Sequence, residues 1–295
     1  MGKRILLIIN PVAGKMKSKN ALFNIVQTFC NHDCVPTIHI TKRAGEATEV
    51  ALREAGNYDV IACCGGDGTL NEVINGVIAS GKEVVIGYIP AGTTNDFANS
   101  VGIPTTIKKA AELIATGEPR KIDVGMCRDK YFSYVASFGA FTAASYGASQ
   151  AAKNVLGHFA YVLDGVNELT KIKPIELRFE VNGEKHTGEY CFGGITNSTS
   201  VGGIVKLKSD LVDMSDGLFE VVMVKMPKNI ADLNAIVAAV TASRFEDCRM
   251  IDYFRTDSIK ITFPENMSMT LDGEEFKCGG DIKIKNLKRK ISIIK

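Results

Sequence analysis

Four short apolar runs, each bounded by glycine, proline or asparagine, occur in the first part of the 295-residue chain, at residues 5–9, 38–40, 60–64 and 84–89. Between them, residues 19–29, 48–55 and 70–80 show helical spacing, and a further helical pattern covers 107–116. Near-continuous apolar strands that alternate with helices are typical of a parallel, doubly wound sheet. The pattern therefore predicts an α/β domain whose ligand lies beyond the carboxyl ends of the strands.

The pattern changes to an alternation of apolar and polar residues from about Asp123 onward. This alternation predicts antiparallel strands, and the sequence Val181-Asn182-Gly183-Glu184 is typical of a hairpin turn. Helical patterns interrupt the strands around 148–169 and at 230–241. The strands are predicted at 131–137, 175–181, 190–196, 218–225, 258–263, 267–271, 281–285 and 290–294. We expect an α/β domain over residues 1–124 and a mainly antiparallel, sandwich-like β domain over 125–295, with the active site in the cleft between them.

Composition adds few constraints. Apolar residues make up 45% of the chain and the net charge is +2, so nothing global favours nucleic acid as a partner. The region from residue 283 to the end is locally basic. Its lysines and arginine alternate with Ile and Leu, which indicates a strand pair with one solvated face or, less favoured, a weak attraction to anionic lipid headgroups.

Eight cysteines show no disulfide or zinc-binding spacing, and the four histidines are not grouped. Free buried thiols in a reducing compartment are the expectation. The apolar run at 5–9 is too short for a signal peptide, and no run approaches the length of a membrane span. We therefore expect a cytoplasmic protein.

The sequence Gly-Gly-Asp-Gly-Thr-Leu-Asn-Glu occupies residues 65–72, directly after the apolar run 60–64. It predicts a buried strand, a glycine-rich turn and a helix. Small residues let the backbone close on a ligand, and the N–H groups that begin a helix favour phosphate. A carboxylate at this point, Asp67, suits a phosphate that arrives with Mg²⁺. The motif indicates a nucleotide-dependent phosphoryl transferase, whereas an ordinary strand–turn–helix corner needs fewer glycines.

Three further segments carry candidate chemistry. Asn-Pro-Val-Ala-Gly-Lys at 10–15 ends the first strand without being a Walker loop. Pro-Ala-Gly-Thr-Thr-Asn-Asp-Phe-Ala at 90–98 presents two hydroxyls, an amide and a carboxylate, although Thr94 or Asn95 is also a candidate helix N-cap. Leu-Asp-Gly-Glu at 271–274 indicates a hairpin, and Glu274 is a candidate proton acceptor for a substrate hydroxyl.

Together these four segments resemble, in order and spacing, the motifs of the diacylglycerol kinase catalytic-domain family, and the likeness to its soluble bacterial lipid kinases runs from end to end. The resemblance implies ATP and Mg²⁺ as cofactors. Residues of all the turns of the α/β domain would bind the nucleotide: Asn10, Pro11, Val12, Ala13, Gly14, Lys15, Thr41, Gly65, Gly66, Asp67, Gly68, Thr69, Leu70, Asn71, Glu72, Gly92, Thr93, Thr94, Asn95 and Asp96.

The resemblance also implies roles for acidic residues. Glu274 matches the general base, with Asp272 beside it, and Asp67 with Asp96 and Asp123 would surround the nucleotide-bound Mg²⁺. A structural Mg²⁺ site would use Asp213, Asp216 and the backbone carbonyl of Leu218, because compact acidic loops supply the oxygen ligands that hard cations prefer.

The expected activity is transfer of the ATP γ-phosphate to diacylglycerol or a related lipid, which gives phosphatidic acid or its analogue. The partner would be a lipid reached from the inner membrane surface by transient, peripheral contact. The sequence leaves the acceptor open, and it also leaves open a homodimer of the kind that bacterial relatives form.

Two departures from the family bear on these expectations. Asn99-Ser100 follows Asn-Asp-Phe-Ala, shortly after which many family members carry a basic residue. Asp164 stands where some relatives place a lysine. Two alternatives to a lipid kinase remain. One is a kinase of a soluble alcohol such as NAD, and the other, less favoured, is a nucleotide-binding regulator without turnover.

Overall fold

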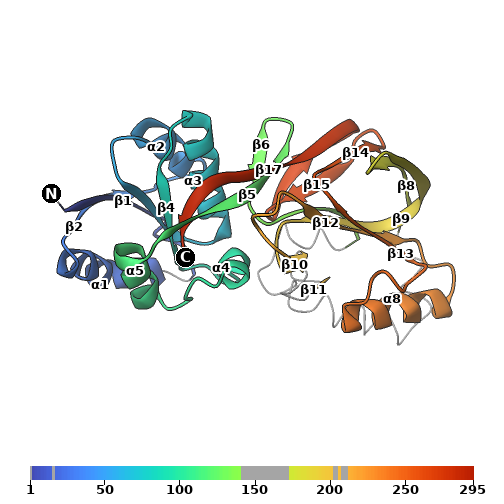
Figure 1. The fold of residues 1–295 in the computed structure, drawn as a ribbon, viewed down its shortest axis with the longest axis horizontal. Helices are drawn as coiled ribbons and strands as arrows, with labels where there is room; N and C mark the ends of the chain where they lie inside the picture. Colours follow the sequence, from blue (N-terminus) through green and yellow to red (C-terminus); the bar gives the residue numbers. More distant parts are fainter. Residues whose placement is uncertain (1, 15–16, 141–172, 202–204, 207–211) are drawn as a thin grey trace. The chain divides into compact units, whose positions relative to one another are not determined.

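The computed structural model describes residues 2–14, 17–140, 173–201, 205–206 and 212–295, which form two compact units (Figure 1). The first unit comprises Met1–Val124 and Lys288–Lys295, and the second comprises Gly125–Leu287. The division predicted from sequence differs for the C-terminal segment. Residues 288–295 belong to the first unit because β17 (Gly280–Ile294) pairs in parallel with β4 (Val85–Pro90), placing Ser292 opposite Val85.

The described part of the first unit contains a parallel sheet in the order β17, β4, β3 (Val60–Gly65), β1 (Lys3–Ile9), β2 (Cys34–Ile40). Helices α1 (Lys17–Asn31) and α5 (Ile107–Thr116) pack together on one face of this sheet. Helices α2 (Glu46–Glu54) and α3 (Asp67–Ser80) pack together on the other face (Figure 1). The predicted doubly wound α/β fold is confirmed.

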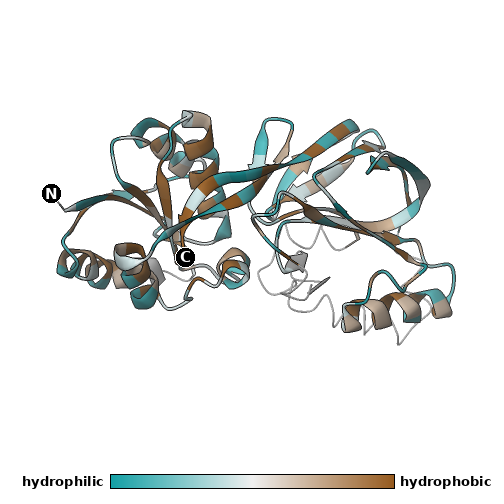
Figure 2. Cartoon of the chain, in the orientation of Figure 1, coloured by the Kyte–Doolittle hydropathy of each residue, from teal (hydrophilic) through white to brown (hydrophobic). Residues whose placement is uncertain are grey.

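The core of the first unit lies along its central strands. Residues such as Ile5 and Leu7 of β1 and Ile61 and Cys63 of β3 are fully buried. Figure 2 shows the hydrophobic residues concentrated along these strands. A strand buried on both faces needs apolar residues at successive positions, which is why these runs show no alternation. The strands end at one edge of the sheet, and the turns that follow β1, β2, β3 and β4 all leave from that edge.

The second unit is built mainly from antiparallel strands, as predicted. Pairs run from β15 (Ser268–Leu271) through β7 (Val135–Gly139), β9 (Glu184–Thr196) and β8 (Ile175–Val181) to β14 (Ser258–Phe263) and β17. Strand β12 (Phe219–Lys225) pairs with β9 and with β13 (Ile251–Thr256). Figure 2 shows alternating hydrophobic and hydrophilic bands along the long strands of this unit. The remaining described elements are β5 (Pro119–Cys127), β6 (Lys130–Phe132), β10 (Ser200–Val201), β11 (Val205–Lys206), α8 (Ile230–Ala242) and β16 (Glu274–Lys277).

Aromatic side chains pack among aliphatic ones in the core of this unit. Phe132 stacks on Phe219 with 5.7 Å between ring centroids, and Phe138 meets Phe263 edge-on at 4.9 Å. The predicted Asn-Gly hairpin joins β8 to β9, with Asn182 and Gly183 at φ values of 51° and 83°. Both positive φ values are those that a two-residue turn of this kind requires.

Two strand predictions were wrong in detail. The predicted strand at 131–137 is two strands, β6 and β7, because backbone N–H groups of Ser133 to Val135 donate to the Asp272 carboxylate. The predicted strands at 281–285 and 290–294 are one strand, β17, which stays continuous through Arg289 despite its φ of 52°.

One predicted helix, at 148–169, lies outside the described residues. Among the residues that the structure describes, no helix is long and apolar enough to cross a membrane.

Candidate active site

The turns after β1, β3 and β4 approach one another with glycine at each contact. A Cβ atom added to Gly14, which has a φ of 53°, would lie 1.9 Å from the carbonyl oxygen of Ala91. A Cβ atom on Gly92 would lie 2.7 Å from the Cα of Gly66. Backbones this close exclude every other residue type at these positions without a shift of the main chain. The glycines of three separate motifs therefore build one compact edge.

Asn10 shapes the first of these turns. Its backbone N–H donates to the carbonyl of Cys64 (3.0 Å), and its side-chain amide donates to the Thr69 hydroxyl (3.1 Å). The same side chain accepts from the backbone N–H of Val12 (3.1 Å). Asn10 thus ties the β1 turn to β3 and α3, and the Val12 side chain projects into solvent with 75% exposure.

Helix α3 begins at this edge without a side-chain cap. Its N-cap is Gly66, which has no side chain, and Asp67 is its first residue. The first N–H groups of a helix lack partners within the helix, and the helix dipole favours negative charge there. Phosphate is the ligand that such an end binds most readily.

Asp67, which was predicted to organise Mg²⁺, is 8% exposed, and its carboxylate accepts hydrogen bonds from the start of another helix. The backbone N–H groups of Asp96 and Phe97, at the start of α4 (Asp96–Val101), donate to it at 3.1 and 3.3 Å. The hydroxyls of Thr94 and Tyr88 each lie 3.4 Å from it. Burial raises the pKa of Asp67, and these four donors oppose that rise. In this structure Asp67 joins the β3 turn to the β4 turn.

Helix α4 is therefore not capped as predicted. Asn95 occupies the N-cap position, but its side chain makes no capping bond. It accepts instead from the backbone N–H of Gly92 (2.9 Å) and donates to the Gly92 carbonyl (3.2 Å), which closes the β4 turn. Asn95 has a φ of 52°, so its side chain points back into the turn rather than along the helix.

Asp96 has a different environment from Asp67. Asp96 is half-buried, and in the described part of the chain no hydrogen bond to its carboxylate is found. Burial first, and then the neighbouring Asp67 carboxylate, raise the pKa of Asp96 to about 6. A carboxylate kept near another acid without donors of its own is a better ligand for a cation than one with four donors.

Asp123 is fully buried in β5, and its carboxylate accepts the backbone N–H of Arg289 at 2.6 Å. This bond holds β17 where Arg289 adopts a positive φ. The structure thus gives Asp123 a role in the first unit's strand geometry.

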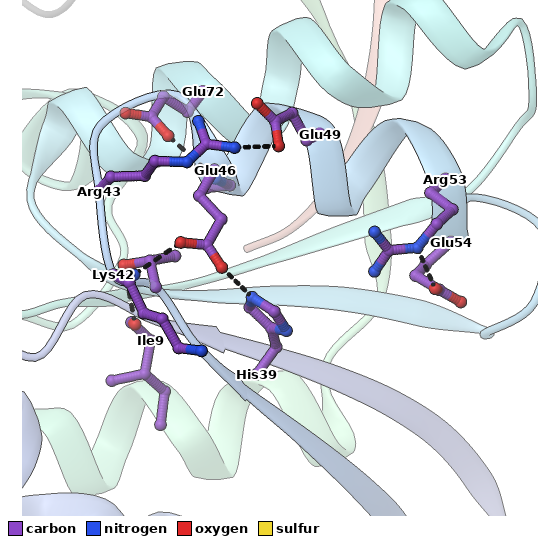
Figure 3. Close-up of polar contacts among 11 residues, drawn as sticks. Ile9, His39, Lys42, Arg43, Glu46, Glu49, Arg53, Glu54 and Glu72 are labelled. Carbon is purple, nitrogen blue, oxygen red and sulfur yellow. Dashed lines mark hydrogen bonds and ion pairs between the residues drawn. The ribbon is translucent and has the colours of Figure 1, made fainter.

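Glu72 and Thr41 fix the segment that follows β2, as Figure 3 shows in part. The Glu72 carboxylate accepts from the N–H groups of Gly45 (2.9 Å) and Ala47 (3.1 Å), at the start of α2. The Thr41 hydroxyl lies 3.2 Å from the Ile9 carbonyl, to which the Thr41 N–H also donates. Both residues were predicted to bind nucleotide, and both make protein contacts beside the nucleotide turns.

The remaining predicted nucleotide residues divide by exposure. Thr93 and Thr94 are exposed on the β4 turn, while Thr69, Leu70 and Asn71 are buried in the first turn of α3 or next to it. Gly65 lies against Thr69, and Gly68 is the second residue of α3. Lys15 lies outside the described residues.

The Leu-Asp-Gly-Glu segment forms the predicted hairpin between β15 and β16. Asp272 and Gly273 occupy its turn at φ values of 51° and 86°. The Asp272 carboxylate accepts from the N–H (2.5 Å) and hydroxyl (2.8 Å) of Ser133 and from the N–H groups of Tyr134 and Val135, both at 3.0 Å. Burial raises its pKa, and these hydrogen bonds oppose the rise. Asp272 anchors the hairpin rather than facing solvent.

Glu274, the predicted general base, is exposed immediately after this turn, as is its neighbour Glu275. The Glu275 carboxylate accepts from the Ser268 hydroxyl across the hairpin at 2.8 Å. A rigid turn held by Asp272 therefore presents the Glu274 side chain at its end.

The predicted structural metal ligands lie in one acidic turn. Asp213 accepts from the N–H and hydroxyl of Ser215, and Asp216 accepts from the N–H of Leu218 (2.8 Å). The second oxygen of Asp216 pairs with Arg255 at 2.6 Å. Among the described residues no group of three or more Asp, Glu, His or Cys side chains is arranged to hold a metal ion. A cation at this turn would compete with Arg255 for Asp216.

Several residues at these sites were not predicted from sequence. Tyr88, inside β4, places its hydroxyl 3.5 Å from Asn95 as well as near Asp67. Ser133 binds Asp272, and Arg255 binds Asp216 and lies 3.5 Å from Glu220. Burial raises the pKa of Glu220 to about 7, although Arg255 opposes the rise. A tyrosine in an otherwise aliphatic buried strand was the one local signal, because a buried hydroxyl needs a partner.

Glycine turns at the carboxyl edge of a parallel sheet, followed by an antiparallel β-sandwich, define a class of two-domain nucleotide-dependent kinases. Two family models match the chain. The diacylglycerol kinase catalytic domain matches residues 4–127, and the YegS C-terminal NAD kinase beta sandwich-like domain matches residues 135–281.

Similar proteins cover nearly the whole chain. It is 35% identical over 277 residues to a diacylglycerol kinase of Bacillus subtilis, covering 92% of this chain and 90% of that one. It is 32% identical over 296 residues to a diacylglycerol kinase of Staphylococcus saprophyticus, covering 99% of this chain and 95% of that one. A crystal structure of a diacylglycerol kinase from Bacillus anthracis superposes on this chain with a TM-score of 0.79 at 26% identity. The match covers 99% of this chain and 96% of that one.

The chain belongs to the diacylglycerol kinase catalytic-domain family. It is a diacylglycerol kinase-type enzyme, a lipid kinase whose family implies the use of ATP.

Proposed function

We propose that this enzyme transfers the γ-phosphate of Mg-ATP to the hydroxyl of diacylglycerol, forming phosphatidic acid and ADP. The observation that carries the nucleotide half of this proposal is the contact of the glycine turns beside the uncapped start of α3. Gly14 meets Ala91 and Gly92 meets Gly66, so the turns lie backbone to backbone beside helix N–H groups of the kind that favour phosphate. The names of the relatives support the lipid half.

Phosphoryl transfer depends mainly on positioning and on neutralising charge. The N–H groups at the start of α3 would hold phosphate oxygens, and the exposed hydroxyls of Thr93 and Thr94 would supply further donors. Mg²⁺, when bound, would neutralise part of the negative charge of the phosphates. The residues present fit this ion through Asp96, whereas Asp67 acts by holding the β4 turn in place.

The acceptor hydroxyl needs a base. In the proposed step the hydroxyl oxygen of diacylglycerol bonds to the γ-phosphorus, and the bond from that phosphorus to the bridging oxygen of ADP breaks. The hydroxyl proton passes to the Glu274 carboxylate. The exposed position of Glu274 after a turn held by Asp272 suits this role, since a base must be both accessible and fixed.

The test is transfer of radiolabelled γ-phosphate from Mg-ATP to a mixed-micelle panel of diacylglycerol, monoacylglycerol, ceramide and phosphatidylglycerol, with NAD alongside. Label in diacylglycerol that Glu274→Gln reduces by about 10²–10⁴-fold supports the proposal. ATP binding by the variant should remain nearly unchanged. Glu275→Gln is the matched control, because Glu275 is an exposed glutamate on the same hairpin, and it should keep wild-type activity.

Other outcomes would change the assignment. Label in another lipid would replace diacylglycerol as the acceptor, and label only in NAD would overturn the lipid acceptor altogether. A Glu274→Gln variant with wild-type turnover would remove Glu274 from the proton transfer. We further propose that the lipid is reached by peripheral contact with a membrane surface. Vesicles of anionic and neutral lipid, sedimented with the enzyme, test that contact.

A further inference from the structure

The segment between β2 and α2 is held rigidly at the edge where the nucleotide turns lie (Figure 3). Thr41 donates to the Ile9 carbonyl, directly before the turn that begins at Asn10. The backbone N–H of Lys42 donates to the Glu46 carboxylate at 2.7 Å, and His39 lies 2.8 Å from the same group. The N–H of Gly45 donates to Glu72 of α3. This segment therefore contacts both elements that would bind the triphosphate.

These contacts use three backbone N–H groups of the segment. The N–H groups of Thr41, Lys42 and Gly45 all donate to protein oxygens. The segment also presents two exposed cationic side chains, those of Lys42 and Arg43. Of these two side chains, that of Arg43 carries a guanidinium group. Its side chain is 61% exposed, and its guanidinium contacts the Glu49 carboxylate of α2 at 2.6 Å.

We propose that Arg43 is a further nucleotide-affinity residue, which binds the phosphates of ATP in competition with Glu49. The inference rests on the proposed use of ATP at this edge. A guanidinium presents several N–H donors in one plane, a geometry that matches phosphate oxygens, and it stays charged at all relevant pH values. An exposed ion pair is held weakly, so a multiply charged phosphate can displace the Glu49 carboxylate.

Helix α2 supplies a matched control at its other end. Arg53 is 62% exposed, nearly the same as Arg43, and its guanidinium pairs with Glu54 at 2.8 Å. The two arginines thus share residue type, exposure and the kind of partner. Figure 3 shows both ion pairs. They differ in place, because Arg43 precedes α2 at the carboxyl edge of the sheet, and Arg53 lies in the last turn of the helix. A general effect of surface charge would act on both alike.

The experiment measures binding of ATP and of adenosine to the full-length protein by titration calorimetry. We expect Arg43→Ala to raise the Kd for ATP about fivefold and to leave that for adenosine unchanged. Glu49→Gln removes the competitor and should lower the Kd for ATP about twofold. Arg53→Ala should change neither constant. In the Arg43→Ala background Glu49→Gln should have no effect, because the group it releases is gone.

Two results would overturn the inference. An ATP Kd for Arg43→Ala that stays within about 1.5-fold of wild type would show that Arg43 does not meet the phosphates. Equal weakening of ATP and adenosine would show a distorted segment instead. Thermal melting of each variant separates folding from binding. Phosphate transfer by the wild-type enzyme is measured in parallel. If Arg43 does not bind ATP, transfer by the wild-type enzyme still occurs, so a failure of this inference is distinguishable from a failure of the proposed function.

Discussion

Replacing Asp272 tests whether this acid acts through structure or through chemistry. The motif places it two residues before the proposed base Glu274, which made a catalytic role the first expectation. In the structure its carboxylate is 5% exposed and accepts four hydrogen bonds from Ser133, Tyr134 and Val135. Asp272→Asn keeps the shape of the side chain but replaces one acceptor oxygen with an N–H₂ donor that faces other donors.

The magnitude follows from the bonds that are lost. Hydrogen bonds to a charged group contribute about 1.5–3 kcal/mol each. Asparagine loses about two of the four, so we expect the free energy of unfolding of the second unit to fall by about 3–5 kcal/mol. At about 2–4 °C per kcal/mol for a domain of this size, Tm should fall by about 10 °C. Ser133→Ala removes only one hydroxyl donor and should cost about 1 kcal/mol.

Calorimetric melting combined with the phosphate-transfer assay separates the two roles. We expect Asp272→Asn to lose stability and activity together, and Glu274→Gln to lose activity at an unchanged Tm. Ser133→Ala should fall between wild type and Asp272→Asn in Tm. An Asp272→Asn protein that melts like wild type and yet transfers no phosphate would refute the reasoning, because it would place Asp272 in the chemistry.

Three further predictions concern single residues. Cys30 is the exposed thiol among eight cysteines, and the other seven are buried. A thiol reagent at pH 8 should therefore modify one group, and this modification should be lost in Cys30→Ser. Gly14→Ala should weaken ATP binding, measured by calorimetry, because its Cβ would lie 1.9 Å from the Ala91 carbonyl oxygen; an unchanged Kd would show that the turns do not need this contact. Glu72→Gln should lower Tm by releasing the start of α2, at about 1–2 kcal/mol, and an unchanged Tm with lost ATP binding would contradict that role.

The periodic parts of the fold could be predicted from sequence because burial acts on neighbouring residues. Continuous apolar runs gave the buried parallel strands, and the pairs Asn182-Gly183 and Asp272-Gly273 gave hairpins because both turn positions need positive φ. The predictions failed where a residue distant in the sequence determines the local structure. The strand predicted at 131–137 breaks in response to Asp272, which is more than 130 residues away in the chain. No local pattern at Ser133 signals that break.

The same limit applies to the candidate site. The motifs located the turns correctly, but residue type alone does not separate a carboxylate that binds a ligand from one that caps a helix. Asp67 accepts from Asp96 and Phe97, and Glu72 accepts from Gly45 and Ala47. Those bonds join residues 25 to 30 positions apart in the chain. They became visible only when the helices were placed beside one another.

The acidic residues of the motifs therefore divide into two groups with different expected responses to substitution. Asp67, Glu72 and Asp272 each accept two or more backbone N–H groups, so a neutral replacement should lower stability before it affects chemistry. Asp96 lies among few donors, with a pKa raised to about 6. Its replacement by asparagine removes a cost of burying charge, so stability should hold or rise while Mg-ATP binding falls. If the two groups instead responded alike, their different hydrogen bonding in the structure would not determine their roles.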